Sequence, residues 1–191
     1  MVTIKKERKV KKFFKRFGPY VIAGCLAFAI VLTGTVVGLT SNNNTSTPVN
    51  TNELIFALPM NNPNVIKDFS NTELQENVTL NQWEAHLSID MSSADNLVYA
   101  VLDGRVTDVS YNYMEGHKIV IEHDGGFESV YSSLDENLLV KEGDMVVRGQ
   151  NIAVASLSAT SETDIGEHLH FTLLKDDIKI DPNLYIELQN K

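Results

Sequence analysis

The chain has 191 residues and a formal net charge of −9, but the charge is unevenly distributed. Residues 1–17 carry eight Lys and Arg against one Glu, a net of +7, whereas the remaining residues carry a net of −16. An acidic body argues against nucleic acid as the partner, because phosphate binding requires Lys and Arg. The length suffices for one domain of about 100–150 residues with appendages.

A long apolar run after the basic segment predicts a membrane anchor. No charged residue occurs from Phe17 to Asn52, and Val21 to Leu39 is nearly all apolar. About 20 helical residues span a hydrocarbon core of ~30 Å. Because Lys and Arg flank only the N-terminal side, the N-terminus should be cytoplasmic and the body outside. We therefore expect a basic cytoplasmic tail over residues 1–17 and a single-pass transmembrane signal anchor over residues 18–40.

The only cysteine, Cys25, excludes an internal disulfide and raises an alternative to the anchor. Residues 22–25, Ile-Ala-Gly-Cys, resemble a lipoprotein signal-peptidase box. Against this reading, too few apolar residues precede Cys25 and too many follow it. The polar residues 41–53, rich in Asn and Thr, predict a short tether. This tether would hold a domain over residues 54–191 close to the membrane.

From residue 54 onward the pattern predicts a mainly antiparallel β domain without a long amphipathic helix. Alternation of apolar and polar residues and turn dipeptides mark the expected strands. They are 98–102 and 105–109 around Asp103-Gly104, 117–123 and 127–134 around Asp124-Gly125-Gly126, short strands within 138–144 and 145–155, and a last hairpin of 167–174 with 179–180.

Two histidines, His168 and His170, stand one residue apart in an apolar run and should point to the same face of a strand. Far upstream, His86 and Asp90 follow a His-x-x-x-Asp spacing. Zinc binds imidazole nitrogen and carboxylate oxygen, and catalytic zinc sites keep three protein ligands and a water. Two His and one Asp would meet that requirement. The other interpretation is that His168 and His170 are core histidines of a β-strand.

The order and context of these motifs resemble the lysostaphin-like, or LytM-like, zinc metalloendopeptidases, which cut peptidoglycan cross-bridges and stem peptides. That family usually shows His-x-Gly-x-Asp first and His-Leu-His-Phe last, and the resemblance covers roughly residues 54–186. It implies a duplicated hybrid-motif type of β domain in which His86, Asp90 and His170 bind Zn²⁺. The metal would lower the pKa of a bound water toward ~7, and His168 would be the general base.

One departure from the family pattern bears on activity. The family has a Tyr-x-His-Leu segment whose histidine stabilises the oxyanion, and residues 131–134 here place Ser133 at that position. Losing one such donor costs about 10²- to 10³-fold in rate, so we expect weak or lost peptidase activity with metal binding retained. Ser88 replaces the usual Gly, and acidic residues within 161–165 would crowd the cleft. His117 could supply the missing group if it lies opposite Ser133, a register that a one-residue slip abolishes.

The whole anatomy resembles sporulation members of the family, located in the forespore membrane of endospore-forming bacteria. This resemblance implies a partner in the mother-cell membrane, of the stage III sporulation protein AH type, and roles in engulfment and in an intercellular channel. The alternative is a membrane-anchored zinc endopeptidase that cleaves peptidoglycan cross-links, which the intact His86, Asp90, His168 and His170 favour. An amidase regulator is disfavoured, because such relatives usually carry coiled coils and no heptads occur here.

Overall fold

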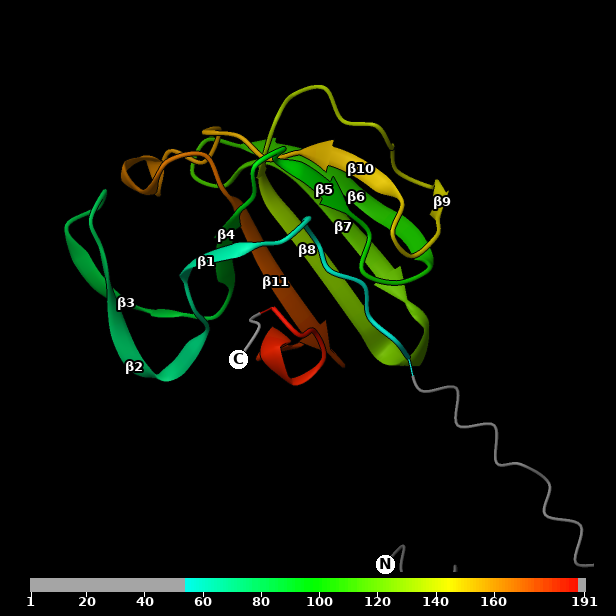
Figure 1. The fold of residues 1–191 in the computed structure, drawn as a ribbon, viewed down its shortest axis with the longest axis horizontal. Helices are drawn as coiled ribbons and strands as arrows, with labels where there is room; N and C mark the ends of the chain where they lie inside the picture. Colours follow the sequence, from blue (N-terminus) through cyan, green and yellow to red (C-terminus); the bar gives the residue numbers. More distant parts are fainter. Residues whose placement is uncertain (1–53, 189–191) are drawn as a thin grey trace, which may run out of the picture. The chain divides into compact units, whose positions relative to one another are not determined.

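The structure, a computed structural model, describes residues 54–188 (Figure 1). The expected tail, anchor and tether lie outside the described residues. Within residues 54–188, no helix combines the length and the apolar character needed to cross a membrane. The mainly antiparallel β architecture is confirmed. Every strand pair is antiparallel, and helix in this part of the chain is limited to three short 3₁₀ turns, η1 (Asp124–Gly126), η2 (Thr163–Ile165) and η3 (Pro182–Leu184).

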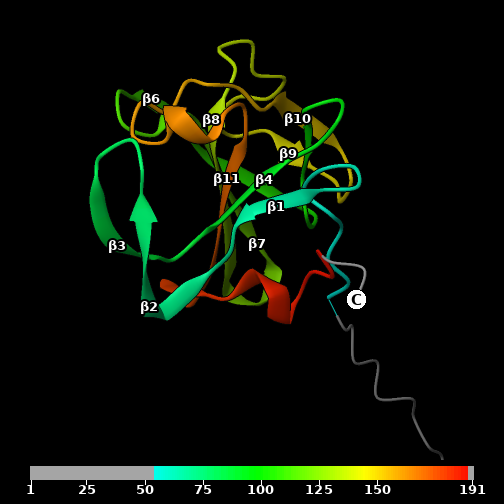
Figure 2. The same cartoon turned by 60° about the vertical axis from the view of Figure 1, so that its left-hand side comes forward.

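An eight-stranded sheet forms the centre of the domain (Figures 1 and 2). Its strands lie in the order β1–β4–β11–β8–β7–β6–β9, and β12 pairs with β11. This order places β4 beside β11, although Asp90 and His170 are 80 positions apart in the sequence. The bounds are β1 Asn64–Lys67, β4 Ile89–Ser92, β6 Gly104–Asn112, β7 Gly116–His123, β8 Phe127–Leu134, β9 Met145–Val146, β11 Leu169–Lys175 and β12 Ile178–Ile180.

Two smaller sheets complete the domain. One pairs β2 (Ser70–Asn77) with β3 (Gln82–His86), and the other pairs β5 (Leu97–Tyr99) with β10 (Asn151–Val154). Figures 1 and 2 show the β2–β3 hairpin on the left, on the side of the main sheet where β1 and β4 lie. The sequence predicts no individual strands over residues 70–86, because their polar composition lacks a clear apolar alternation.

The two strands around Asp103-Gly104 exist, but they do not pair with each other. β5 pairs with β10, whereas β6 pairs with β7 and β9. The connecting residues 100–102 are buried, and their backbone hydrogen bonds go elsewhere: Ala100 N–H donates to Gln150 O at 2.9 Å, and Val101 N–H to the Tyr131 hydroxyl at 2.9 Å. These bonds fix the backbone where the chain passes from the β5–β10 sheet to the main sheet.

The hairpin around residues 124–126 is confirmed with the expected alternation. Ile119 and Ile121 are fully buried, and η1 joins β7 to β8. A bulge between His117 and Ile119 shifts the register, so that His117 lies opposite Leu134 and not opposite Ser133. The last hairpin, β11 with β12, is also confirmed. The segment 138–144 is not a strand. Asp144 N–H bonds locally to Lys141 O, and only isolated bonds reach other segments, Leu139 N–H to Ile152 O and Gly143 N–H to Val106 O.

The hydrophobic core draws on residues from Met60 to Leu188, so the described part of the chain carries a core of its own. Its largest fully buried side chains include Tyr131 and Phe171, whose ring centroids lie 5.3 Å apart between β8 and β11. Burying a side chain of this size contributes about 1.5–3 kcal/mol. The core therefore holds β11 firmly in the middle of the sheet, between β4 and β8.

Candidate metal centre

Asp90 and His170 meet across the β4–β11 pair. They are direct partners in the antiparallel register, and His170 Nδ1 lies 2.7 Å from Asp90 Oδ1. Asp90 is fully buried, whereas the His170 side chain keeps 23% exposure. The pairing of these strands thus places one imidazole and one carboxylate side by side.

His86 reaches the same point from the end of β3. Its Nδ1–H donates to the Asp68 backbone carbonyl at 3.0 Å, which fixes the tautomer and leaves a lone pair on Nε2. That Nε2 lies 3.1 Å from Asp90 Oδ2. The arrangement is the one expected of a metal-binding histidine, whose far nitrogen is held by a backbone carbonyl.

His168 stands directly before β11 and is fully buried. Its Nδ1–H donates to the Gly166 carbonyl at 2.7 Å, so its Nε2 also carries a lone pair. Gly166 has φ 86° and ψ −171°, a conformation that is essentially open only to glycine. Both His168 and His170 face one carboxylate, as the same-face expectation required: their ring nitrogens lie 3.6 and 3.0 Å from Glu162 Oε2.

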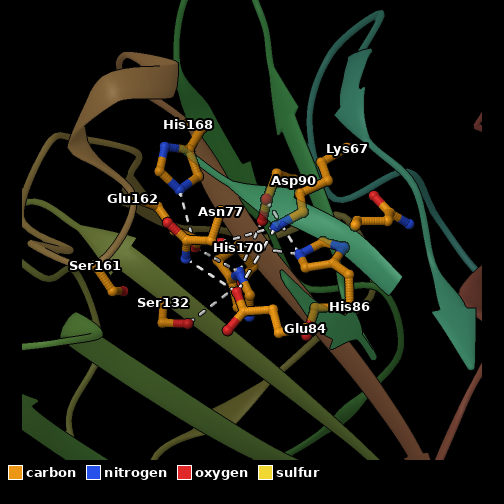
Figure 3. Close-up of polar contacts among 12 residues, drawn as sticks. Lys67, Asn77, Glu84, His86, Asp90, Ser132, Ser161, Glu162, His168 and His170 are labelled. Carbon is orange, nitrogen blue, oxygen red and sulfur yellow. Dashed lines mark hydrogen bonds and ion pairs between the residues drawn. The ribbon is translucent and has the colours of Figure 1, made fainter. Parts of the chain in front are cut away.

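Glu162 is the residue of this cluster that the sequence did not single out. Figure 3 shows its side chain entering from the loop before η2 and pointing toward His168 and His170. The sequence indicated that acidic residues precede the last motif, but it could not tell which carboxylate turns inward. Glu162 is 8% exposed, and a group of four potential ligands results, His86, Asp90, Glu162 and His170.

The electrostatics of the cluster follow from two carboxylates among three imidazoles. Burial acts to lower the pKa of His170, but hydrogen bonds and charges from Asp90 and Glu162 outweigh it and raise that pKa to about 10. Burial acts to raise the pKa of Asp90 and of Glu162, yet the neighbouring histidines hold both below their usual values. The carboxylates of Asp90 and Glu162 and the imidazole of His170 thus favour one another's charged forms.

The donor set fits a zinc ion. His86 Nε2, Asp90 Oδ2 and His168 Nε2 are buried atoms without a hydrogen-bond partner among the described residues. Buried polar atoms are rarely left unpaired, because each costs about 1–3 kcal/mol. A cation placed among them would satisfy His86 and Asp90 at once. Imidazole nitrogen and carboxylate oxygen are the ligands that zinc prefers besides thiolate.

Neither Ser133 nor His117 joins this cluster. Ser133 is buried with φ 61°, and its hydroxyl donates to the Ser156 backbone carbonyl at 2.9 Å. His117 stacks on Tyr111 with ring centroids 4.7 Å apart. The register on which the His117 hypothesis depended is not found, because the bulge in β7 places His117 opposite Leu134.

A cavity of about 380 Å³ opens beside the cluster. His86, Glu162 and His170 form one side of it, and Ser132 rather than Ser133 lines it from β8. Glu84, Glu115 and Lys179 are also in its wall, so its lining carries more negative than positive charge.

Residues 84–182, just over half of the chain, match the family model of Peptidase family M23. The chain belongs to peptidase family M23. The matched segment begins two residues before His86 and extends beyond β12, so it contains all members of the cluster. The M23 assignment confirms the resemblance seen in the motifs.

Among M23 relatives, stage II sporulation protein Q of Bacillus subtilis (strain 168) is 30% identical over 154 residues. The alignment covers 74% of this chain and 54% of that protein, so the chain spans about half the length of this relative.

Two solved structures are similar to the M23 domain. A chain in the structure of the SpoIIQ–SpoIIIAH pore forming complex superposes with a TM-score of 0.62 at 26% identity, covering 70% of this chain and 91% of that one. A zinc containing peptidase from Vibrio cholerae gives a TM-score of 0.53 at 31% identity, covering 62% of this chain and 35% of that one.

Proposed function

We propose that the protein is a forespore membrane protein whose M23 domain holds zinc and pairs with a mother-cell partner of the SpoIIIAH type. The likeness to stage II sporulation protein Q supports this, together with a neighbour that was solved in a SpoIIQ–SpoIIIAH complex. The basic tail would lie in the cytoplasm and the domain in the intermembrane space. There the pair would act in engulfment and in a channel between the two cells.

The observation that carries a weak or lost peptidase activity is the side chain of Ser133. The resemblance gives this position a histidine that stabilises the oxyanion. In this chain the short Ser133 hydroxyl donates a hydrogen bond to the Ser156 backbone carbonyl at 2.9 Å. A donor that is already bonded to a backbone carbonyl contributes nothing to a developing negative charge, so a loss of about 10²- to 10³-fold is expected.

The remaining residues of the site keep their chemistry. Zinc, when bound, would supply Lewis-acid polarisation of water or of the scissile carbonyl. His86, Asp90 and His170 would hold it, and the Nε2 lone pair of His168 could accept a proton. A scaffold that retains its metal residues but lacks one donor is suited to a structural role for the metal, since binding energy at the site adds to folding energy.

Partner binding tests the proposal. The full-length chain, purified in detergent, is titrated with the ectodomain of the SpoIIIAH-type protein from the same organism. An M23 domain from a cell-wall peptidase serves as the control of the same fold. We expect saturable binding by this chain and none by the control. If this chain and the control domain bind the partner equally, or if neither binds it, the proposed pairing is wrong.

A working endopeptidase is the second candidate, and the convergence of His86, Asp90, His168 and His170 on one point favours it. Muropeptide release from purified peptidoglycan, with zinc supplied, separates the two candidates. If the native chain releases products and His168→Ala stops it, the protein is an enzyme that tolerates Ser133. If only Ser133→His is active, one position has silenced a peptidase. Silence of both supports the binding role.

A further inference from the structure

We propose that Glu162 is a fourth protein ligand of the metal, so that His86, Asp90, Glu162 and His170 form a closed, structural site. This inference deepens the proposed function, because it concerns the same metal centre. The resemblance assigns three ligands and an open position, whereas the chain itself supplies a fourth side chain at that point.

The four candidate donors lie close enough together to surround one ion. With zinc–ligand bonds of about 2.0–2.2 Å, neighbouring ligand atoms of a tetrahedron lie about 3.3–3.6 Å apart. The separations in the cluster lie around that value. His86 Nε2 is 3.1 Å from Asp90 Oδ2, and His170 Nδ1 is 2.7 Å from Asp90 Oδ1. The two oxygens of Glu162 face different imidazoles, Oε2 at 3.0 Å from His170 Nδ1 and Oε1 at 4.0 Å from His86 Nε2. One donor atom from each of the four residues lies within 4.8 Å of all the others.

The charges favour the same shell. Two carboxylates and two neutral imidazoles balance the two positive charges of the ion, so the occupied site would be neutral. Neutrality matters here because an unbalanced charge in a buried site is costly. Lys67 Nζ lies 3.9 Å from Glu162 Oε1, but it also pairs with Glu84 Oε1 at 3.8 Å, and so its charge is shared with a carboxylate outside the shell.

Hydrogen bonds on both sides of Glu162 hold its loop in place. Before it, the Ser161 hydroxyl donates to Met114 O at 2.7 Å and the Thr160 hydroxyl donates to Tyr113 O at 2.6 Å. After it, Asp164 N–H donates at 3.0 Å to the hydroxyl of Thr79, which lies in the turn of the β2–β3 hairpin. Because the loop is hydrogen-bonded on both sides of Glu162, the carboxylate is held in a fixed position in the site.

A fourth protein ligand would occupy the coordination position that a hydrolytic zinc site leaves open for water. Structural zinc sites have four protein ligands, and catalytic ones have three and a water. Glu162 Oε2 lies 3.6 Å from His168 Nε2, so the imidazole that would act as base faces a carboxylate. Together with Ser133, a closed shell gives this chain two independent obstacles to peptide hydrolysis.

The test uses the full-length chain in detergent, with zinc and cobalt(II) as probes. Zinc affinity is measured by chelator competition for native protein, Glu162→Ala and Glu162→Gln. The matched control is Glu115→Gln, which lines the same cavity, but its carboxylate accepts from Asn112 and pairs with Lys118, outside the cluster. We expect Glu162→Ala to bind zinc about 10- to 100-fold more weakly, and Glu115→Gln to stay within about threefold of native.

Azide is then added to test whether the bound cobalt(II) has a coordination position that an external ligand can occupy. It should leave the visible absorption of the cobalt-loaded native protein unchanged and shift that of Glu162→Ala. A native spectrum that responds to azide as strongly as the variant overturns the proposal, as does an unchanged zinc affinity in Glu162→Ala. The azide response of the native protein is informative without any variant. If Glu162→Ala does not fold, Glu162→Gln replaces it in both measurements. Partner binding is a separate measurement, so a failure here leaves the pairing proposal standing.

Discussion

His123 and His86 show how the surroundings of one imidazole separate a structural histidine from a candidate ligand. In both, Nδ1–H donates to a backbone carbonyl, that of Asp103 at 2.9 Å and that of Asp68 at 3.0 Å. In His123 the second nitrogen is also used, because Nε2 lies 2.6 Å from the Ser129 hydroxyl. In His86 it has no hydrogen-bond partner among the described residues. A histidine with both nitrogens occupied cannot ligate a metal, and His123 is structural, as its place at the turn indicates.

The neutral state of His123 predicts a pH dependence of stability. Burial lowers the pKa of His123 below its ordinary 6.5, although the Asp103 carbonyl opposes the shift. Below pH 6.5 the unfolded chain therefore takes up a proton that the folded protein does not, and the free energy of unfolding falls as pH decreases. We expect His123→Gln to be less stable than the native protein at pH 7, by about 1 kcal/mol for the lost hydrogen bond.

Urea unfolding of residues 52–191 between pH 7 and pH 5 measures the effect. Because the variant lacks the titrating group, the stability difference between the two proteins should narrow as pH falls. A difference that stays constant across this range would show that His123 does not contribute to the pH dependence.

At the scale of elements, one buried pair of hydroxyls joins β11 to the segment between β3 and β4. Ser88 Oγ lies 2.7 Å from Thr172 Oγ1, and both residues are nearly fully buried. Ser88 is the position where the motif of the family usually has Gly. The structure shows how the larger residue is accommodated: its hydroxyl finds a partner on the strand that carries His170.

A double-mutant cycle tests this pair. Thr172→Val alone should cost about 1–3 kcal/mol of unfolding free energy, because it leaves the Ser88 hydroxyl buried without a partner. Adding Ser88→Ala should recover part of the loss, with a coupling energy of about 1 kcal/mol or more. Additive effects of the two substitutions would mean that the hydroxyls do not depend on each other.

At the scale of the whole molecule, the candidate ligands join four separate segments. They come from the end of β3, from β4, from the loop before η2 and from β11. An ion bound only by the folded state stabilises it by about 2.7 kcal/mol when present at 100 times its Kd. For a domain of this size, a chelator should therefore lower the midpoint of thermal unfolding by roughly 10 °C.

The control for metal removal is Asp90→Asn, which weakens the site without changing its shape. Its unfolding midpoint should respond little to chelator, since it has little metal to lose. Identical responses of the native and Asp90→Asn proteins would assign the stabilisation to metal bound elsewhere on the chain.

The sequence by itself indicated the strands from β7 onward that surround the site and four of the side chains that are grouped there, but not β3, β4 or Glu162. Alternation in residues 117–134 predicted β7 and β8 because a strand buries every second side chain. His86, Asp90, His168 and His170 could be grouped because each pair sits in a short motif whose local spacing is set by the backbone. These are properties of neighbouring residues, and they can be read without knowing the fold.

Only the tertiary structure decided the roles that depend on distant segments. The bulge in β7 turned His117 away from Ser133, since a bulge inserts a residue without a local sequence signal. The sheet order separated β5 from β6 despite the turn dipeptide between them. The inward path of Glu162 depends on anchors at Tyr113, Met114 and Thr79, all at least 47 positions away. Long-range hydrogen bonds of this kind are formed by the folded backbone, and no periodic pattern in the chain encodes them.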